Sequence, residues 1–313
     1  MLMSFSKSDV PDVYVVTGSN TGMGKLVASL LYSKNARVYV AARSEERANK
    51  AIDDIKKAYP SSKGSLAFMK LGLSDLSLVK ASANFFLSRE SKLNGLFNNA
   101  GAMYVDTKGP QDTVQGFEMN LGVNVIGPFL LTKVLMPALA AAVPSEPEGS
   151  VRVVWLCSLG TELIGERSRG MTANRDMAAY KRYSHMDRYA LSKAANWLHA
   201  AEYARRIRSA GVVSVPLNPG NNSTELARQH PALVQFFLRR IVYPPVYGAY
   251  TQLYAAFSKD IGLANSGIWV APFGRLLPIR GDLLDATKSK AEGGNGHAAE
   301  FWDWTEEQVK AFN

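Results

Sequence analysis

The sequence has little of what builds disulfide-stabilised or metal-binding proteins. It contains one cysteine, Cys157, and four histidines among 313 residues. A single cysteine cannot form an internal disulfide, and neither it nor the histidines show metal-ligand spacing. We therefore expect no bound metal and a reducing compartment, the cytoplasm.

The sequence also lacks clear membrane or export signals. Residues 1–12 show no basic segment followed by an apolar core, so no secretory signal is predicted. No uninterrupted apolar run reaches the ~18 residues of a membrane-spanning helix. The longest apolar stretch, 125–143, contains Lys133 and two prolines, and we interpret it as a buried helix.

Acidic residues are outnumbered by basic ones, 27 to 36, which gives a formal net charge of +9. A basic protein can bind nucleic acid, a membrane surface or a phosphorylated ligand. The basic residues are scattered, without an arginine-rich arm, a zinc finger or an aromatic and basic RNA motif. We do not expect nucleic-acid binding, and a phosphorylated cofactor remains open.

Apolar strands alternate with helices along most of the chain. The expected strands are 12–18, 36–43, 65–73, 93–101, 150–158 and 211–220, and two long helices are expected at 114–142 and ending near 209. This alternation predicts an α/β fold with a doubly wound parallel sheet. We expect one domain over 1–313, with a substrate lid at about 221–260 and a terminal helix at about 298–313 that packs through Phe301, Trp302 and Trp304.

A glycine-rich turn follows the first expected strand. The stretch TGSNTGMG, residues 17–24, places Gly18, Gly22 and Gly24 between that strand and a helix. Glycines let the chain turn tightly, and the helix start offers N–H groups to a phosphate. The spacing differs from the common Gly-x-Gly-x-x-Gly, but its context favours dinucleotide binding.

A tyrosine and a lysine are spaced one helical turn apart in DRYALSKAANW, residues 187–197. Tyr189 and Lys193 should therefore share one helix face. Taken alone, such a pair is more often surface decoration than chemistry.

Several motifs together resemble one family. TGSNTGMG, NNAG (98–101), Asn124 in GVNVIGPFLL, Ser158 in WLCSLG, YALSK (189–193) and NPGNNST (218–224) occur in this order. Residues 12–225 thereby resemble the short-chain dehydrogenase/reductase family, most closely its retinol-dehydrogenase-like branch. The resemblance implies a Rossmann-type fold, NAD(H) or NADP(H), and no metal.

The resemblance also implies roles for four residues. Tyr189 would donate or accept the proton, and Lys193 would activate it and bind the nicotinamide ribose. Ser158 would hold the substrate oxygen, and Asn124 would support a proton relay through water. A lysine ammonium and a cationic nicotinamide should lower the tyrosine's pKa from about 10 towards working pH.

The cofactor-binding prediction covers residues after five of the six expected strands, together with the Tyr189 and Lys193 pair. These are Gly18, Asn20, Thr21, Gly22, Met23, Gly24, Arg43, Ser44, Leu73, Asn99, Ala100, Gly101, Tyr189, Lys193, Pro219, Gly220 and Thr224. Arg43 ends the second strand, where an NAD site would offer an acid, so NADP(H) is predicted over NAD(H). Ser44 could cap the next helix or add a bond to the 2′-phosphate.

Two positions depart from the family pattern. Gly72 replaces the usual aspartate beside the adenine, so adenine contact would rest on the Leu73 backbone, and Asp75 would cap the following helix. Cys157 stands where the family often has serine, and we expect it to be buried and inert.

The substrate-facing segments leave several alternatives open. Residues 159–188 are expected to form a pocket wall, and 233–250 an apolar lid or a membrane-surface helix. An apolar carbonyl or secondary alcohol is the expected substrate class, but neither its identity nor the direction of reaction follows. The rivals are a non-catalytic NAD(P)-binding regulator and a nucleotide-sugar epimerase or dehydratase. A homodimer or homotetramer is expected through the 114–142 and Tyr189 helices.

Overall fold

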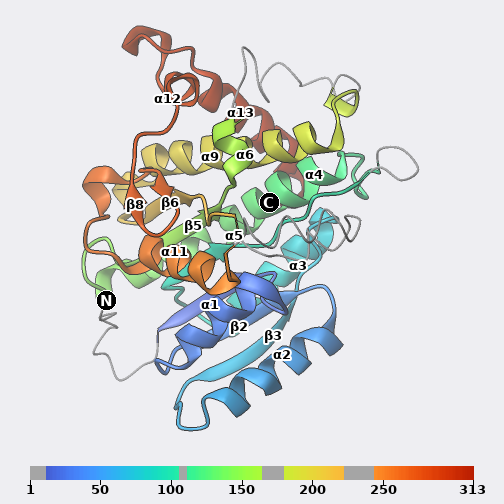
Figure 1. Ribbon diagram of the computed structural model, residues 1–313, viewed down its shortest axis with the longest axis vertical. Helices are drawn as coiled ribbons and strands as arrows, with labels where there is room; N and C mark the ends of the chain where they lie inside the picture. The colour runs from blue at the N-terminus through green and yellow to red at the C-terminus, as the bar shows by residue number, and fades with distance from the viewer. Residues whose placement is uncertain (1–11, 106–110, 164–179, 222–242) are drawn as a thin grey trace.

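The computed structural model describes residues 12–105, 111–163, 180–221 and 243–313. At its centre lies an eight-stranded sheet in the order β3-β2-β1-β4-β5-β6-β7-β8, with helices on both faces (Figure 1). The strands are β1 (Val13–Thr17), β2 (Arg37–Ala42), β3 (Ser65–Lys70), β4 (Gly95–Asn98), β5 (Arg152–Leu156), β6 (Val213–Leu217), β7 (Val270–Ala271) and β8 (Arg275–Leu276). All neighbours pair in parallel except β7 and β8. The predicted doubly wound Rossmann-type fold is confirmed.

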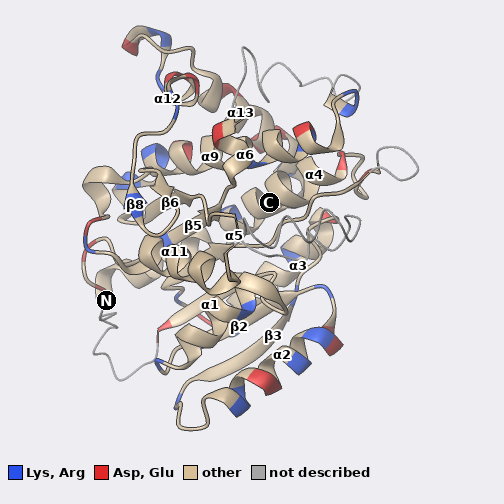
Figure 2. Cartoon of the chain, in the orientation of Figure 1, with Lys and Arg blue, Asp and Glu red and all other residues tan. Residues whose placement is uncertain are grey.

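Side chains of each central strand divide between two helical layers because they alternate along the strand. In β1, Val13 and Val15 face a core with α3 (Leu76–Leu87), α5 (Gly127–Ala142) and α9 (His185–Arg206). Tyr14 and Val16 face the opposite core, with α1 (Gly22–Tyr32) and α11 (Pro245–Phe257). Helix α2 (Glu45–Ala58) covers the sheet beside α1 and mixes both signs of charge on its outer side (Figure 2).

The predicted 114–142 helix begins later than expected. Residues 113–117 form a turn in which Thr113 N–H donates to the Phe117 carbonyl at 2.7 Å. Glu118 then caps α4 (Met119–Leu121), which continues through the π-helical turn η1 (Gly122–Ile126) into α5. The predicted start at 114 was wrong because the Glu118 cap, rather than apolar periodicity, sets the boundary.

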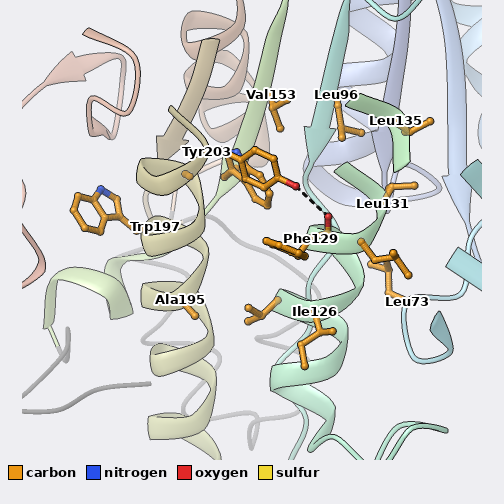
Figure 3. Close-up of a cluster of buried hydrophobic side chains, with 14 of the residues drawn as sticks. Leu73, Leu96, Ile126, Phe129, Leu131, Leu135, Val153, Ala195, Trp197 and Tyr203 are labelled. Atoms are coloured by element: carbon orange, nitrogen blue, oxygen red, sulfur yellow. Dashed lines mark hydrogen bonds between the residues drawn. The ribbon is translucent and has the colours of Figure 1, made fainter. Parts of the chain in front are cut away.

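The predicted burial of this apolar helix is confirmed. Met119–Ser145 is long and apolar enough to cross a membrane, but 67% of its most apolar window is buried inside the fold. Phe129 packs between α5 and α9, and the Tyr203 hydroxyl donates to its carbonyl at 3.4 Å (Figure 3). The prolines do not end the helix: Pro128 stands in the first turn of α5, directly after η1, and Pro137 lies inside α5.

The C-terminal helix α13 (His297–Val309) packs on the body as predicted. Phe301 and Trp302 are buried, and Trp304 meets Phe117 edge-on at 6.4 Å. Trp302 also packs edge-on against Phe129 of α5 and Tyr203 of α9. The chain itself thus covers apolar surface that suggested pairing with a second copy, and the predicted dimer or tetramer loses this support.

The remaining elements are short or lie near the C-terminus. They are η2 (Val143–Ser145), α6 (Leu159–Leu163), η3 (Arg208–Ala210), η5 (Leu263–Asn265), α12 (Gly281–Thr287), η6 (Lys290–Glu292) and η7 (Lys310–Phe312). Helix α11 buries Ala249 and Leu253 against the sheet and α1, so it belongs to the helical layer. Residues 222–242 lie outside the described residues, and a substrate lid there stays a prediction.

Candidate functional site

The predicted site residues follow the carboxyl ends of neighbouring parallel strands. Positions 18–24 follow β1, Arg43 and Ser44 follow β2, Leu73 follows β3, Asn99–Gly101 follow β4, Ser158 follows β5, and Pro219 and Gly220 follow β6. Thr224 lies outside the described residues. Since β1 lies between β2 and β4, the strand order reverses there, where open α/β sheets bind ligands.

The turn after β1 depends on its glycines. Gly18 and Gly22 have φ of +66° and +56°, in the left-handed region that favours glycine. A Cβ at Gly22 would meet nothing within 4 Å, so this position opens outward. A Cβ at Gly24 would lie 2.5 Å from Asn99 Nδ2 and 2.7 Å from the Gly18 oxygen. Gly24 therefore lets α1 approach β4, whereas Gly22 lets the turn bend.

Two side chains hold this turn to β4. The Asn99 amide donates to the Thr17 carbonyl at 2.7 Å and accepts from Gln252 of α11 at 3.1 Å. The Thr17 hydroxyl donates to the Phe97 carbonyl at 3.1 Å and accepts from Ala100 N–H at 2.8 Å. All these groups lie inside the protein, so the cradle is fixed by buried hydrogen bonds.

Lys193 reaches from α9 to the ends of β4 and β5. Its ammonium donates to the Leu156 carbonyl at 2.9 Å, and the residue is 2% exposed. A Cβ at Gly101 would stand 2.7 Å from Lys193 Nζ, so glycine leaves space for the ammonium. Burial lowers the pKa of Lys193 to about 8.

Tyr189 and Ser158 meet beside this lysine. The two hydroxyls are hydrogen-bonded, and Lys193 Nζ lies 5.9 Å from the centre of the tyrosine ring. Burial raises the pKa of Tyr189, and the bond from Ser158 opposes that rise. In the protein alone, burial outweighs the bond from Ser158. The predicted lowering depends on a bound, cationic nicotinamide as well as on Lys193, and it stays a prediction for the cofactor-loaded protein.

Asn124 stands in η1, where the helix widens. Its amide accepts from Ala102 N–H at 2.9 Å and donates to the Ala102 carbonyl at 2.9 Å and to Ser192 Oγ at 3.0 Å. Both amide hydrogens are therefore used in tying η1 to α9 and to the segment after β4. π-Helical turns recur at functional sites, and the water-relay role of Asn124 stays a prediction.

The residues after β2 present an accessible cation. Arg43 is exposed and forms no ion pair with any described residue, including Glu45 and Glu46. Its charge opposes the burial that raises the pKa of Tyr104, so the guanidinium lies towards the segment after β4. Ser44 caps α2 by accepting from Arg47 N–H at 3.3 Å, as predicted.

After β3, Asp75 caps α3 as predicted, by accepting from Ser77 N–H at 3.0 Å. Adenine contact through the Leu73 backbone stays a prediction. The Leu73 side chain is buried in the core, which leaves only its backbone for a ligand. Cys157 is buried as predicted, and burial raises the pKa of its thiol to about 12.

Sequence reasoning missed several supporting residues. Gln252 lies 153 positions beyond Asn99, and no local motif links them. Ser192, inside the YALSK motif, bonds both Asn124 and the Tyr189 carbonyl, and no role was predicted for it. Of these residues, only Ser192 could have been found from the sequence. It lies one helical turn after Arg188, so it shares a helix face with that residue, next to Tyr189. Within the described ranges, no three His, Cys, Asp or Glu residues gather to hold a metal.

Comparison with known proteins agrees with this geometry. The family described as short chain dehydrogenase matches residues 12–233. A short-chain dehydrogenase/reductase from Neocamarosporium betae is 49% identical over 314 residues, covering 99% of this chain and 90% of that protein. Retinol dehydrogenase 11 from Mus musculus is 35% identical over 251 residues, covering 80% of this chain and 74% of that protein. The fold matches Pseudomonas aeruginosa RhlG, solved as an NADP complex, with a TM-score of 0.65, 20% identity and coverage of 84% and 95%. The chain therefore belongs to the short-chain dehydrogenase/reductase family of oxidoreductases, and it resembles the family's retinol dehydrogenases.

Proposed function

We propose that this chain is an NADP(H)-dependent oxidoreductase acting on the carbonyl or secondary alcohol of a largely apolar small molecule. The observation that carries the proposal is the convergence of Ser158, Tyr189 and Lys193 at the carboxyl ends of β4 and β5. A hydroxyl pair next to a buried ammonium can hold a carbonyl oxygen and exchange a proton with it. The proposal includes a cytoplasmic location, for which the single, buried cysteine is the support.

The cradle fits a dinucleotide. Gly22 opens outward at the start of α1, where helix N–H groups can receive a diphosphate. Lys193 and Gly101 would lie at the nicotinamide ribose, and Pro219 and Gly220 at the end of β6 would flank the ring. When bound, the nicotinamide supplies the hydride to a carbonyl carbon or accepts it in the reverse reaction.

In the reducing direction, Tyr189 would be the proton donor. Because burial raises its pKa, Tyr189 keeps its proton at neutral pH and can donate it to the substrate oxygen. Ser158 can hold that oxygen, since its hydroxyl already reaches the Tyr189 hydroxyl. Lys193, with a pKa of about 8, is mostly protonated at neutral pH and can stabilise the phenolate left behind.

The preference for NADP(H) rests on Arg43. An exposed guanidinium without an ion-pair partner among the described residues can give a 2′-phosphate two charge-assisted bonds. One hydrogen bond to a charged group contributes ~1.5–3 kcal/mol, or roughly ten- to hundred-fold discrimination. The next acid, Glu45, already lies in α2.

An apolar substrate is supported by exposed apolar side chains close in the sequence to Ser158 and Tyr189. Leu163, at the end of α6, and Met186, in the first turn of α9, are 62% and 59% exposed. Exposed apolar side chains at a site offer contact to an apolar ligand. The relative named retinol dehydrogenase 11 acts, by its name, on an apolar alcohol.

The test is oxidation of NADPH and NADH across a panel of apolar aldehydes and ketones. We expect turnover with kcat/KM at least ~ten-fold higher for NADPH, and Arg43→Ala should lose most of that preference by weakening NADPH alone. Equal use of both cofactors would refute the NADP preference. Cofactor binding without turnover on any carbonyl would support the regulatory alternative, and turnover of nucleotide sugars would support the epimerase alternative.

A further inference from the structure

A buried ion pair lies one residue from Tyr189. The Arg188 guanidinium Nε stands 3.2 Å from Glu118 Oε1, and both side chains are 1% exposed. Arg188 Nη1 also donates to the Lys181 and Tyr183 carbonyls at 3.0 and 2.6 Å. The guanidinium thus joins the start of α9 to the turn before it and to the start of α4.

Glu118 connects Arg188 to residues near the site through further hydrogen bonds. Its carboxylate caps α4 by accepting from Leu121 N–H at 3.1 Å, and it accepts from the Asn120 amide at 2.7 Å. The Asn120 oxygen in turn accepts from Tyr104 N–H at 3.1 Å, on the segment that follows Gly101. The ion pair and the hydrogen bonds of Glu118 and Asn120 therefore link Arg188 to the segment that follows Gly101.

A second contact holds α9 on the other side of Tyr189. Ser192, four residues after Arg188, accepts from the Asn124 amide at 3.0 Å and donates to the Tyr189 carbonyl at 2.6 Å. Residues 188 and 192 share one face of α9, and Glu118 and Asn124 lie on the α4–η1 helix opposite. The two helices are thus held at two points that bracket the tyrosine.

Stability alone does not account for such a pair. Burying two charges carries a desolvation penalty, and well-packed apolar residues often stabilise as much. What an ion pair adds is a defined register, because sliding or rotating α9 would separate the charges. A register matters here because proton transfer requires Tyr189 at hydrogen-bond distance from the substrate oxygen.

We propose that Arg188, through Glu118, is a positioning residue that sets the register of α9 and so the place of the Tyr189 hydroxyl. The inference rests on the proposed function, since it assigns Tyr189 as the proton donor. A displaced hydroxyl should slow the chemical step and leave cofactor binding at the glycine turn unchanged. The effect should therefore appear in kcat and not in the cofactor dissociation constant.

The experiment compares the double variant Arg188→Met/Glu118→Gln with the wild type. The double variant leaves neither charge buried alone, and the amide oxygen introduced by Glu118→Gln can still accept from Leu121 N–H. We expect kcat to fall roughly 10- to 100-fold, with NADPH affinity within two-fold, about the precision of a titration. Arg206→Met is the matched control, because Arg206 pairs with Glu202 at the far end of the same helix. It should leave kcat unchanged even if the melting temperature falls.

A second measurement separates this inference from the proposed function. Hydrogen exchange of peptides covering 185–195 should accelerate in the double variant and stay unchanged in Arg206→Met. If the wild type turns over no carbonyl, the proposed function fails, and the exchange result alone decides the positioning role. Unchanged exchange at 185–195, or wild-type kcat in a folded double variant, would overturn it.

Discussion

The glycine turn after β1 and the Tyr189 cluster lie at the same edge of the sheet but are built differently. The turn occupies eight consecutive residues, and its shape depends on backbone angles and on the space beside Gly18 and Gly24. The cluster draws side chains from the end of β5 and from α9, and burial controls their proton affinities. A methyl group added at a glycine should therefore disrupt the turn, whereas removal of a proton or a charge should inactivate the Tyr189 cluster.

The largest difference between the regions should come from Tyr189→Phe. The change removes the donated proton and little volume, so kcat should fall at least ~100-fold, with cofactor affinity retained. Stopped-flow or steady-state NADPH oxidation measures the first quantity, and fluorescence titration the second. Tyr250→Phe, on an exposed ring of α11, is the control and should change neither. Near-normal kcat in the Tyr189 variant would remove it from the mechanism.

Lys193→Met should abolish turnover and at the same time increase the stability of the fold. The folded pKa of Lys193, about 8, is below its unfolded value of 10.5, so the buried ammonium destabilises the fold below pH 8. This penalty is relieved as pH rises from 8 to 10.5, where the unfolded chain still binds the proton. A shift of this size corresponds to roughly 3 kcal/mol, partly offset by the lost bond to Leu156.

We therefore expect the free Lys193→Met protein to be about 1–2 kcal/mol more stable than wild type at pH 6–7, with turnover abolished. The gain should shrink above pH 8. Urea unfolding of both proteins between pH 6 and 10 measures it, with Lys25→Met, which removes a surface pair with Asp54, as the control. A variant less stable than wild type at every pH would contradict the burial argument.

Substitutions at Gly24 and Gly22 should separate two roles of the glycine turn, its packing against β4 and its binding of the cofactor. Gly24→Ala places a methyl group on Asn99 and the Gly18 carbonyl, so the free protein should lose ~1–3 kcal/mol. Gly22→Ala meets open space and strains only its backbone, by ~1–2 kcal/mol. Its methyl group points to where a cofactor would lie, so cofactor affinity should fall more in Gly22→Ala than in Gly24→Ala. Thermal melts with and without NADPH measure both effects, and equal losses of affinity would contradict this division.

The smallest expected effect concerns α13, which covers part of α5 and α9. Because Phe301 and Trp302 already bury apolar surface there, we expect a monomer by light scattering at micromolar concentration. The ion pair between Lys133 and Glu306 is partly exposed. Lys133→Met should therefore change stability by less than ~1 kcal/mol and leave the mass unchanged. A stable dimer of the wild type would show that another face mediates association.

The order of elements and the local motifs were predictable from the sequence alone. The β-branched runs of β1, β2 and β6 and the caps at Ser44 and Asp75 depend on neighbouring residues, so local rules identify them. The glycines of the turn belong to the same class, because a positive φ restricts residue type locally. Short strands such as β7 and β8, with two residues each, carry too little periodicity to be predicted.

What only the tertiary structure decided is the environment of each candidate residue. The sequence places Tyr189 and Lys193 one turn apart, but their proton affinities depend on the surrounding elements. In the protein alone, burial raises the pKa of Tyr189 and lowers that of Lys193. The hydrogen bond from Gln252 to Asn99 and the ion pair of Arg188 with Glu118 join residues far apart in the chain. Backbone geometry is a short-range property of the chain, whereas burial, electrostatics and helix register arise from packing between distant segments, and these determine the chemistry of the site.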